Sequence, residues 1–177
     1  MNEPHAVLNE LDDVAAAAAL RRCCGSERWV IAMTRERPYP STRALLGAAE
    51  RHWGQLEERD LLEAFSQHPQ IGEDVTLLRQ RFVATHALSA REQSGLSGAD
   101  DATLLALRDG NRAYRERFGF IFIVCASGKS ASEMLELLQA RLPNERTSEL
   151  ALAAAEQAKI TVLRLQGLTA GLERPGA

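Results

Sequence analysis

The chain has few cysteines, no excess of basic charge and no long apolar run, and each absence argues against a class of protein. Three cysteines is an odd number, and Cys23 and Cys24 are adjacent, so a disulfide framework is not indicated. We therefore expect reduced thiols in a cytoplasmic protein. The formal net charge of −3, with basic residues scattered among acidic ones, predicts neither a nucleic-acid partner nor a basic membrane-binding patch.

Membrane and cofactor signals are missing as well. No apolar run approaches the roughly 20 residues of a membrane span, and the polar N-terminus predicts no secretory signal. The four histidines and three cysteines show no HExxH or CxxC spacing, so we expect no metal. Residues 127–130 (Ser-Gly-Lys-Ser) suggest a phosphate-binding loop, but the Walker pattern requires glycine where Ile123 stands. We therefore reject nucleotide binding.

What the sequence does contain is one helical pattern after another. The 177 residues are 45% hydrophobic, which is enough for a single all-α domain over residues 1–177, built as a multi-helix bundle. Capping signals predict helix starts at Asn9, Ser26, Ser41 and Ser130. The predicted helices cover residues 9–22, 26–33, 42–56, 60–67, 75–87, 100–118, 130–142 and 145–168, with another opening at residues 89–92.

Residues 118–126 (FGFIFIVCA) interrupt the helical pattern. Aromatic and β-branched residues favour a strand, but no other segment of the chain indicates a partner strand. We therefore expect one buried, irregular apolar segment within the helical bundle.

His68 is the first candidate for chemistry. It precedes Pro69, which disfavours helical geometry for His68, and Gly72 allows a sharp turn shortly afterwards. A titratable imidazole held on a rigid bend suits proton transfer. A loop histidine bonded to a backbone carbonyl explains the same pattern equally well.

Glu92 and Gln93 place a carboxylate beside an amide. Ser89 and Glu92 have the spacing of a capping box, in which Glu92 only bonds back to the backbone of Ser89. That structural role alone would account for Glu92. It is nevertheless compatible with ligand binding, because a helix N-terminus also presents backbone N–H groups to anions.

Arg164 is the third candidate. At 100° per residue it falls within the apolar arc of the helix predicted over residues 145–168, which would bury its guanidinium. A buried guanidinium requires an anionic partner, either an internal salt bridge or an anionic ligand. Leu152 and Leu163 lie on the opposite side, so a second subunit could also cover this helix.

Taken together, these motifs resemble the 2-oxo-4-hydroxy-4-carboxy-5-ureidoimidazoline (OHCU) decarboxylases of urate catabolism, nearly end to end. Several motifs in one order are specific, although each alone is weak. The motifs are Cys23-Cys24-Gly25-Ser26 with Trp29, Arg37-Pro38-Tyr39, His68-Pro69 with Ile71-Gly72, Ser89 with Glu92-Gln93 and Gly95, Tyr114, Phe118-Gly119-Phe120 with Phe122-Ile123, Arg141-Leu142 with Asn144, Glu149-Leu150, Lys159-Ile160 and Arg164-Leu165.

The resemblance implies an all-α, cofactor-free, usually dimeric enzyme that converts OHCU, a small ureide, to (S)-allantoin and carbon dioxide. It implies that His68 is the essential histidine and that Glu92 acts with it. The positions it implies for substrate contact are Pro69, Ser89, Gln93, Arg164 and the backbone of Phe122, Ile123, Val124, Cys125 and Ala126. Ile121 departs from the pattern, since the family commonly has proline there.

Two other function classes remain open. In a non-catalytic helical interaction module, His68 and Glu92 would be only loop and cap residues. A hydrolase or isomerase of a related ureide could use the same base, and it would differ from a decarboxylase in releasing no carbon dioxide.

Overall fold

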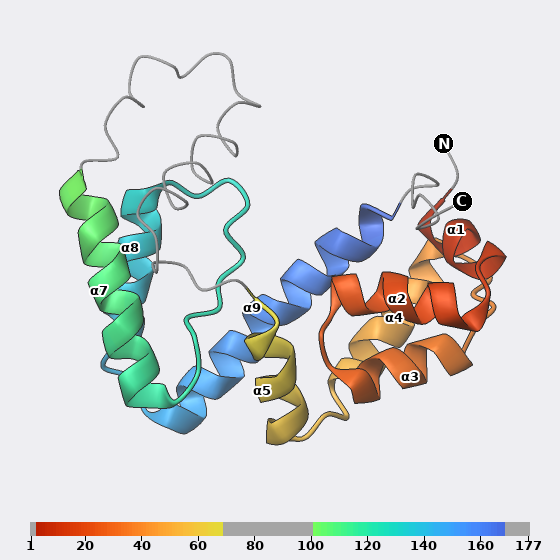
Figure 1. Cartoon of the computed structure of the whole chain (residues 1–177), viewed down its shortest axis with the longest axis horizontal. Coiled ribbons are helices and arrows are strands. Elements are labelled where there is room, and N and C mark those ends of the chain that lie inside the picture. The colour runs from red at the N-terminus through yellow and green to blue at the C-terminus, as the bar shows by residue number, and fades with distance from the viewer. Residues whose placement is uncertain (1–2, 69–100, 169–177) are drawn as a thin grey trace, which may run out of the picture. The chain divides into compact units, whose positions relative to one another are not determined.

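The computed structural model describes residues 3–68 and 101–168, and all regular structure within these stretches is α-helical (Figure 1). The predicted all-α class is confirmed. The chain divides into two compact units, Met1–Gln67 with Ala154–Ala177 and His68–Ala153. The helices are α1 (Pro4–Glu10), α2 (Asp13–Cys23), α3 (Glu27–Arg35), α4 (Thr42–Trp53), α5 (Glu58–Ser66), α7 (Asp101–Phe118), α8 (Ala131–Arg141) and α9 (Arg146–Gln166).

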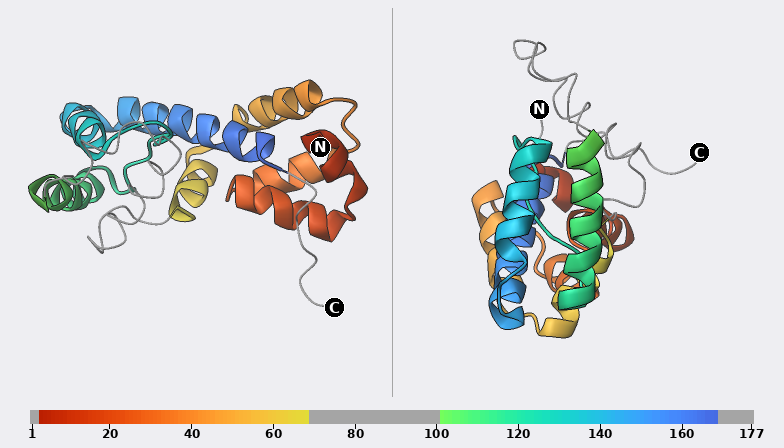
Figure 2. Two further views of the ribbon diagram at one scale, coloured as in Figure 1. Left: turned by 90° about the horizontal axis from the view of Figure 1, so that it is seen from above. Right: turned by 90° about the vertical axis from the view of Figure 1, so that its left-hand side faces the viewer.

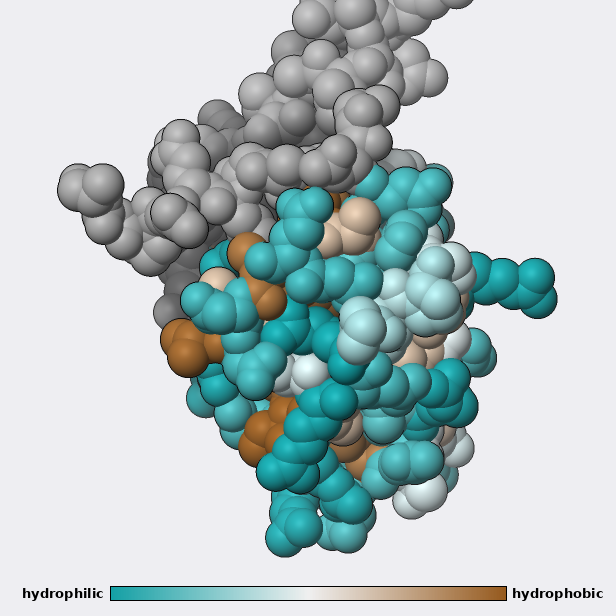
Figure 3. Space-filling view, turned by 90° about the vertical axis from the view of Figure 1, so that its right-hand side faces the viewer, coloured by the Kyte–Doolittle hydropathy of each residue, from teal (hydrophilic) through white to brown (hydrophobic). Residues whose placement is uncertain are grey.

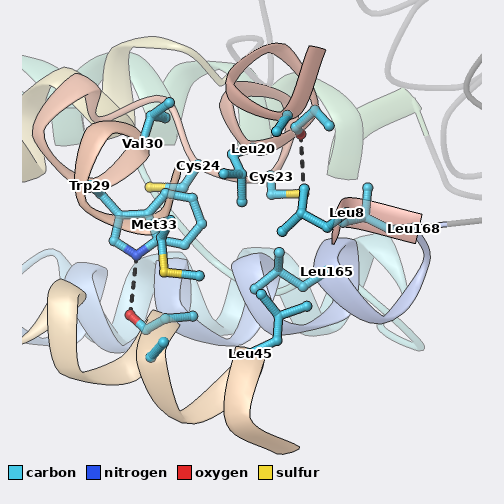
Figure 4. Close-up of a cluster of buried hydrophobic side chains, with 14 of the residues drawn as sticks. Leu8, Leu20, Cys23, Cys24, Trp29, Val30, Met33, Leu45, Leu165 and Leu168 are labelled. Carbon is cyan, nitrogen blue, oxygen red and sulfur yellow. Dashed lines mark hydrogen bonds between the residues drawn. The ribbon is translucent and has the colours of Figure 1, made fainter. Parts of the chain in front are cut away.

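The core of the first unit is formed by α1 to α4 and the last turns of α9 (Figure 4). Leu20, Trp29, Leu45 and Leu165 are completely buried there. The ring N–H of Trp29 donates a hydrogen bond of 3.1 Å to the carbonyl of Ala49, which satisfies its one polar atom inside an apolar cluster. This core therefore fixes α2, α3 and α4 against the C-terminal end of α9.

Two helices of the first unit, α3 and α4, begin where side-chain caps predict. Ser26 and Ser41 accept backbone N–H bonds at 3.4 and 3.1 Å and so cap α3 and α4. α5 begins at Glu58, two residues before the predicted start. The reason is that Asp60 is the third residue of this helix, and its carboxylate accepts the backbone N–H of Glu57 at 3.0 Å.

The predicted helix over residues 9–22, capped by Asn9, is wrong at its start. Asn9 lies inside α1, and the cap of α2 is Asp12, which accepts a backbone N–H at 2.8 Å. The Asn9 side chain instead bonds the backbone N–H and carbonyl of Tyr39, at 2.9 and 2.8 Å. This pairing spans 30 residues, so local sequence could not indicate it.

In the second unit, α7 and α8 lie side by side (Figures 1 and 2). The capping box predicted at Ser130 is confirmed. Its hydroxyl accepts the backbone N–H of Glu133 at 3.2 Å, and the Glu133 carboxylate accepts the backbone N–H of Ser130 at 2.7 Å. The helix predicted over residues 75–87, and the one predicted to open at residues 89–92, lie outside the described residues.

Two glycines bracket the segment between α7 and α8. Gly119 has φ +80° and Gly128 has φ +76°, a backbone conformation that side chains with a Cβ rarely adopt. Gly119 ends α7, and its backbone N–H bonds the carbonyl of Arg115 at 2.9 Å. Residues 120–127 therefore connect α7 to α8 between two glycines whose backbone conformation is fixed.

No helix in the described part of the chain is both long enough and apolar enough to cross a membrane. Figure 3 views the side of the first unit, where hydrophilic side chains predominate and the apolar ones form small separate groups.

Candidate active site

The expected site residues fall in three places. Phe122, Ile123, Val124, Cys125 and Ala126 belong to the irregular segment of the second unit, His68 follows the end of α5 and is half-buried, and Arg164 lies on α9 within the first unit. Pro69, Ser89, Glu92 and Gln93 lie outside the described residues.

The predicted irregular segment is confirmed, and it is buried along most of its length. Phe122, Ile123 and Val124 are 3%, 2% and 7% exposed, Cys125 is half-buried, and Ala126 is exposed. The Phe122 ring meets the ring of Tyr114 edge-on, with centroids 5.3 Å apart. The segment thus runs from an aromatic cluster out to the surface.

A buried ion pair lies against this segment. Arg141, the last residue of α8, donates from Nε to Oε1 of Glu149 at 2.6 Å, and Glu149 is completely buried. The same guanidinium donates from Nη1 to the carbonyl of Ile123 at 2.9 Å and lies 4.7 Å from the Phe122 ring centroid. One side chain therefore joins a carboxylate on α9 to the backbone of the apolar segment.

The remaining polar atoms around Glu149 are satisfied. The Tyr114 hydroxyl donates to Oε1, and the Asn144 amide donates to Oε2 at 2.8 Å. Burial, and next the hydrogen bond to the Glu149 carboxylate, raise the pKa of Tyr114 well above its ordinary value. Tyr114 is therefore a permanent hydrogen-bond donor here and no source of protons near neutral pH.

The segment is also tethered at its other end. The ammonium of Lys129 donates to the carbonyl of Cys125 at 2.8 Å, and the Lys129 backbone N–H donates to the carbonyl of Ala126 at 3.1 Å. In contrast, the backbone N–H groups of Ile123 and Val124 donate to no group in the described part of the chain. Within the described residues, the carbonyls of Ile123, Cys125 and Ala126 thus have hydrogen-bond donors, whereas the N–H groups of Ile123 and Val124 have no acceptor.

Arg164 is not buried as the helical projection predicted; its residue is exposed. The buried stripe of α9 in the first unit passes through Gln157, Thr161 and Leu165. Arg164 precedes Leu165 in the sequence, so it lies about 100° around the helix from this stripe. Its Nη1 donates at 3.3 Å to the carbonyls of Arg22 and Cys23, at the C-terminal end of α2, where a cation is favoured. Among the described residues, Nε and Nη2 of Arg164 have no hydrogen-bond partner.

The adjacent thiols do not supply a nucleophile. Burial raises the pKa of both Cys23 and Cys24 to about 11, and the nearby charge of Arg164 only partly opposes this. Both are neutral thiols near neutral pH. Within residues 3–68 and 101–168, no group of three or more His, Cys, Asp or Glu side chains could hold a metal ion.

A groove of about 930 Å³ separates α4 from α9 within the first unit. Its lining includes Leu46, Trp53, Val162 and Leu163, together with the cationic residues Arg43 and Lys159. No residue expected to bind substrate lines it, so we do not assign it to the active site.

The sequence alone gives no role to the groups that hold the segment. Tyr114, Arg141 and Glu149 stand out there only as parts of family motifs, and Lys129 only as part of residues 127–130, which fail the Walker pattern. The available signal was a charged pair, Arg141 and Glu149, each at an apolar position of its helix.

Comparison with known proteins adds the family. The family described as OHCU decarboxylase matches residues 9–166. A uric acid degradation bifunctional protein of Arabidopsis thaliana is 40% identical over 147 residues, which cover 82% of this chain but 45% of that protein. An OHCU decarboxylase of Halalkalicoccus jeotgali is 27% identical over 165 residues, covering 92% of this chain and 89% of that protein.

Solved structures agree with the fold. An OHCU decarboxylase crystallised in the presence of (S)-allantoin matches with a TM-score of 0.68 and 34% identity, covering 88% of this chain and 96% of that one. This chain spans less than half of the two bifunctional relatives from Arabidopsis thaliana and a Bacillus species, 45% and 31% of their lengths.

Proposed function

The chain belongs to the OHCU decarboxylase family, and from this premise we propose that it decarboxylates OHCU to (S)-allantoin without a cofactor. One observation carries the proposal: the 34% identity to an OHCU decarboxylase crystallised in the presence of (S)-allantoin, over 96% of that chain. The available backbone N–H groups of Ile123 and Val124 support it, because a ureide presents carbonyl oxygens that accept such donors.

The proposed chemistry follows from the substrate. Its reacting carbon bears a hydroxyl and a carboxylate and adjoins a C=N bond. When the bond to the carboxylate breaks, carbon dioxide leaves and the electron pair passes into the C=N group, so the substrate contains its own electron sink. The enzyme needs to orient the carboxylate and deliver a proton to one face.

Each expected site residue has a proposed task in this scheme. His68 transfers the proton, because an imidazole with an ordinary pKa near ~6.5 serves both directions at neutral pH. Glu92 acts with His68 and, with Gln93, contacts the ureido and ring nitrogens. Arg164 holds a substrate oxygen with the guanidinium N–H groups not used on α2. Pro69, Ser89 and residues 122–126 form the remaining contacts.

We also propose that residues 1–177 form one domain and that the protein is a cytoplasmic homodimer. The dimer is supported by two exposed leucines: Leu163 is 48% exposed beside the groove between α4 and α9, and Leu152 is 44% exposed.

The cytoplasmic location is supported by the cysteines, since all three are free thiols. A single monomeric species in sedimentation velocity would contradict the dimer, and recovery of the protein from a secreted fraction would contradict the location.

The test is circular dichroism during a coupled reaction. Urate is oxidised and the first product hydrolysed to generate OHCU in place, and this protein is then added. We expect a fast rise of the (S)-allantoin signal. Replacing His68 with alanine should slow it by about 100- to 10,000-fold, the usual contribution of a general acid–base.

The matched control is His52→Ala, which removes a histidine bonded at 2.6 Å to Glu36, and it should leave turnover unchanged. If the wild-type protein does not speed the spontaneous decay, the decarboxylase proposal fails and a non-catalytic module becomes the better reading. If ureide is consumed without release of carbon dioxide, the protein is a hydrolase or an isomerase.

A further inference from the structure

We propose that Arg141 and Glu149 are positioning residues, whose ion pair fixes the peptide plane between Ile123 and Val124 so that the Val124 N–H faces the ligand. The inference rests on the proposed function and adds to it two residues that need not touch the substrate themselves. It is carried by one side chain, that of Arg141, which contacts both a fully buried carboxylate and a backbone carbonyl of the segment.

Residues 123–125 have no regular secondary structure to fix their peptide planes. A strand would fix each plane through a ladder of hydrogen bonds, and a helix would do so through its own turns. Here the Arg141 guanidinium holds the carbonyl of Ile123 at 2.9 Å, and the Lys129 ammonium holds that of Cys125 at 2.8 Å. Because a carbonyl and the following N–H share one plane, holding the Ile123 carbonyl also sets the direction of the Val124 N–H.

Stability alone is a poor explanation for this ion pair. A buried salt bridge is often no more stabilising than apolar side chains of the same volume, because both charges lose their hydration. The surroundings of Arg141 include the rings of Phe122 and Tyr114, so an apolar residue would pack there. What an apolar residue could not do is donate a hydrogen bond to the Ile123 carbonyl.

Glu149 holds the guanidinium in place. Its Oε1 accepts from Nε of Arg141 at 2.6 Å, and its Oε2 accepts from Asn144 at 2.8 Å. The two charged residues lie on helices, α8 and α9, so their positions are fixed by regular backbone. The ion pair thus fixes the Ile123 carbonyl, in a segment without regular structure, relative to residues of two helices.

The experiment compares Arg141→Lys with Arg37→Lys in the full-length protein. Lysine keeps a charge for Glu149 but lacks the planar fork that reaches two acceptors. Arg37 is the matched control, because its side chain is 9% exposed, against 11% for Arg141, and it donates at 2.7 Å to the carbonyls of Leu8 and Leu11 in the first unit.

Two readouts are measured on each variant, the hydrogen exchange of the amides of residues 122–126 and the separate values of KM and kcat. We expect Arg141→Lys to speed exchange in this segment and to raise KM about tenfold, with a smaller change in kcat. The reason is that a binding-competent backbone populated one-tenth of the time weakens apparent affinity by that factor. Arg37→Lys should change neither readout.

If KM does not change while exchange accelerates, the segment is held by Arg141 but does not serve the ligand, and the inference is overturned. Unchanged exchange also overturns it. Where Arg141→Lys does not fold, Tyr114→Phe replaces it, since this variant removes one hydrogen bond to Glu149 and keeps the ring; we then expect a rise in KM of about threefold. Failure of the proposed function would differ, because the wild-type protein would then show no turnover.

Discussion

Three arginines show how the environment of a guanidinium decides what it can do. The side chains of Arg37 and Arg141 are only 9% and 11% exposed, and both donate to backbone carbonyls, so they join distant parts of the chain. Arg164 is exposed and uses only Nη1 within the described residues. Of these three arginines, Arg164 therefore has donors left for a ligand, although the helical projection predicts that it is buried.

Replacing Arg164 with alanine should weaken binding of (S)-allantoin by about 10- to 100-fold, the range expected for a charge-assisted hydrogen bond. The free energy of unfolding should change little, because the side chain is exposed and its two bonds are long, at 3.3 Å. Isothermal titration calorimetry and denaturant unfolding measure the two quantities. Arg22→Ala serves as the control, since it keeps the backbone carbonyl that Arg164 contacts; equal affinity of wild type and Arg164→Ala would remove Arg164 from the site.

Helix ends, more than helix interiors, determine the geometry of the segment that we place in the active site. α7 ends at Gly119 with φ +80°, and α8 begins after Gly128 with φ +76° and the Ser130 cap. A Cβ added at Gly119 would meet no atom within 4 Å, so any cost of alanine there comes from the backbone conformation alone.

Gly119→Ala should therefore lower the free energy of unfolding by about 1–2 kcal/mol, the cost of a left-handed conformation with a Cβ. The matched variant is Gly47→Ala, in the interior of α4, where the added Cβ would lie 3.8 Å from the Arg51 side chain. It should raise the free energy of unfolding by up to about 1 kcal/mol, because alanine favours a helix over glycine. Equal shifts in urea denaturation would show that Gly119 is not strained in this way.

The chain as a whole carries several ionisable groups that burial keeps neutral. Burial raises the pKa of Cys23 and Cys24 to about 11, and it raises the pKa of Tyr39 and Tyr114 above the ordinary tyrosine range. For each group the folded protein binds its proton more tightly than the unfolded chain does. Their contribution to stability is therefore complete below the unfolded pKa and is lost as the pH rises through the folded pKa.

We accordingly expect the free energy of unfolding to fall between about pH 9 and pH 11, by up to about 1.4 kcal/mol per pH unit for each of the two thiols. Denaturant unfolding at several pH values measures this slope. The double variant Cys23→Ala with Cys24→Ala should be less stable at pH 7 but show a shallower slope above pH 9. The same slope in the variant would mean that the two thiols are not the groups responsible.

The sequence by itself determined the helical class, the capping of α3, α4 and α8, and the irregular form of residues 120–126. Each of these depends on interactions within a few residues, such as the bonds between Ser130 and Glu133, or on the lack of a partner strand. The sequence also identified the family, because the family's motifs occur in the same order along the chain.

Only the tertiary structure decided what the long polar side chains do. Asn9 bonds Tyr39 across 30 residues instead of capping a helix, Arg141 reaches Ile123 across 18, and Arg164 reaches Cys23 across 141. Whether such a group is buried, and which atom it meets, depends on how helices pack and on rotations of about 100° per residue around them. Arg164 is exposed and the next residue, Leu165, is buried. The apolar arc read from the sequence is wide enough to include both residues, and only the packing of neighbouring helices determines which part of that arc is covered.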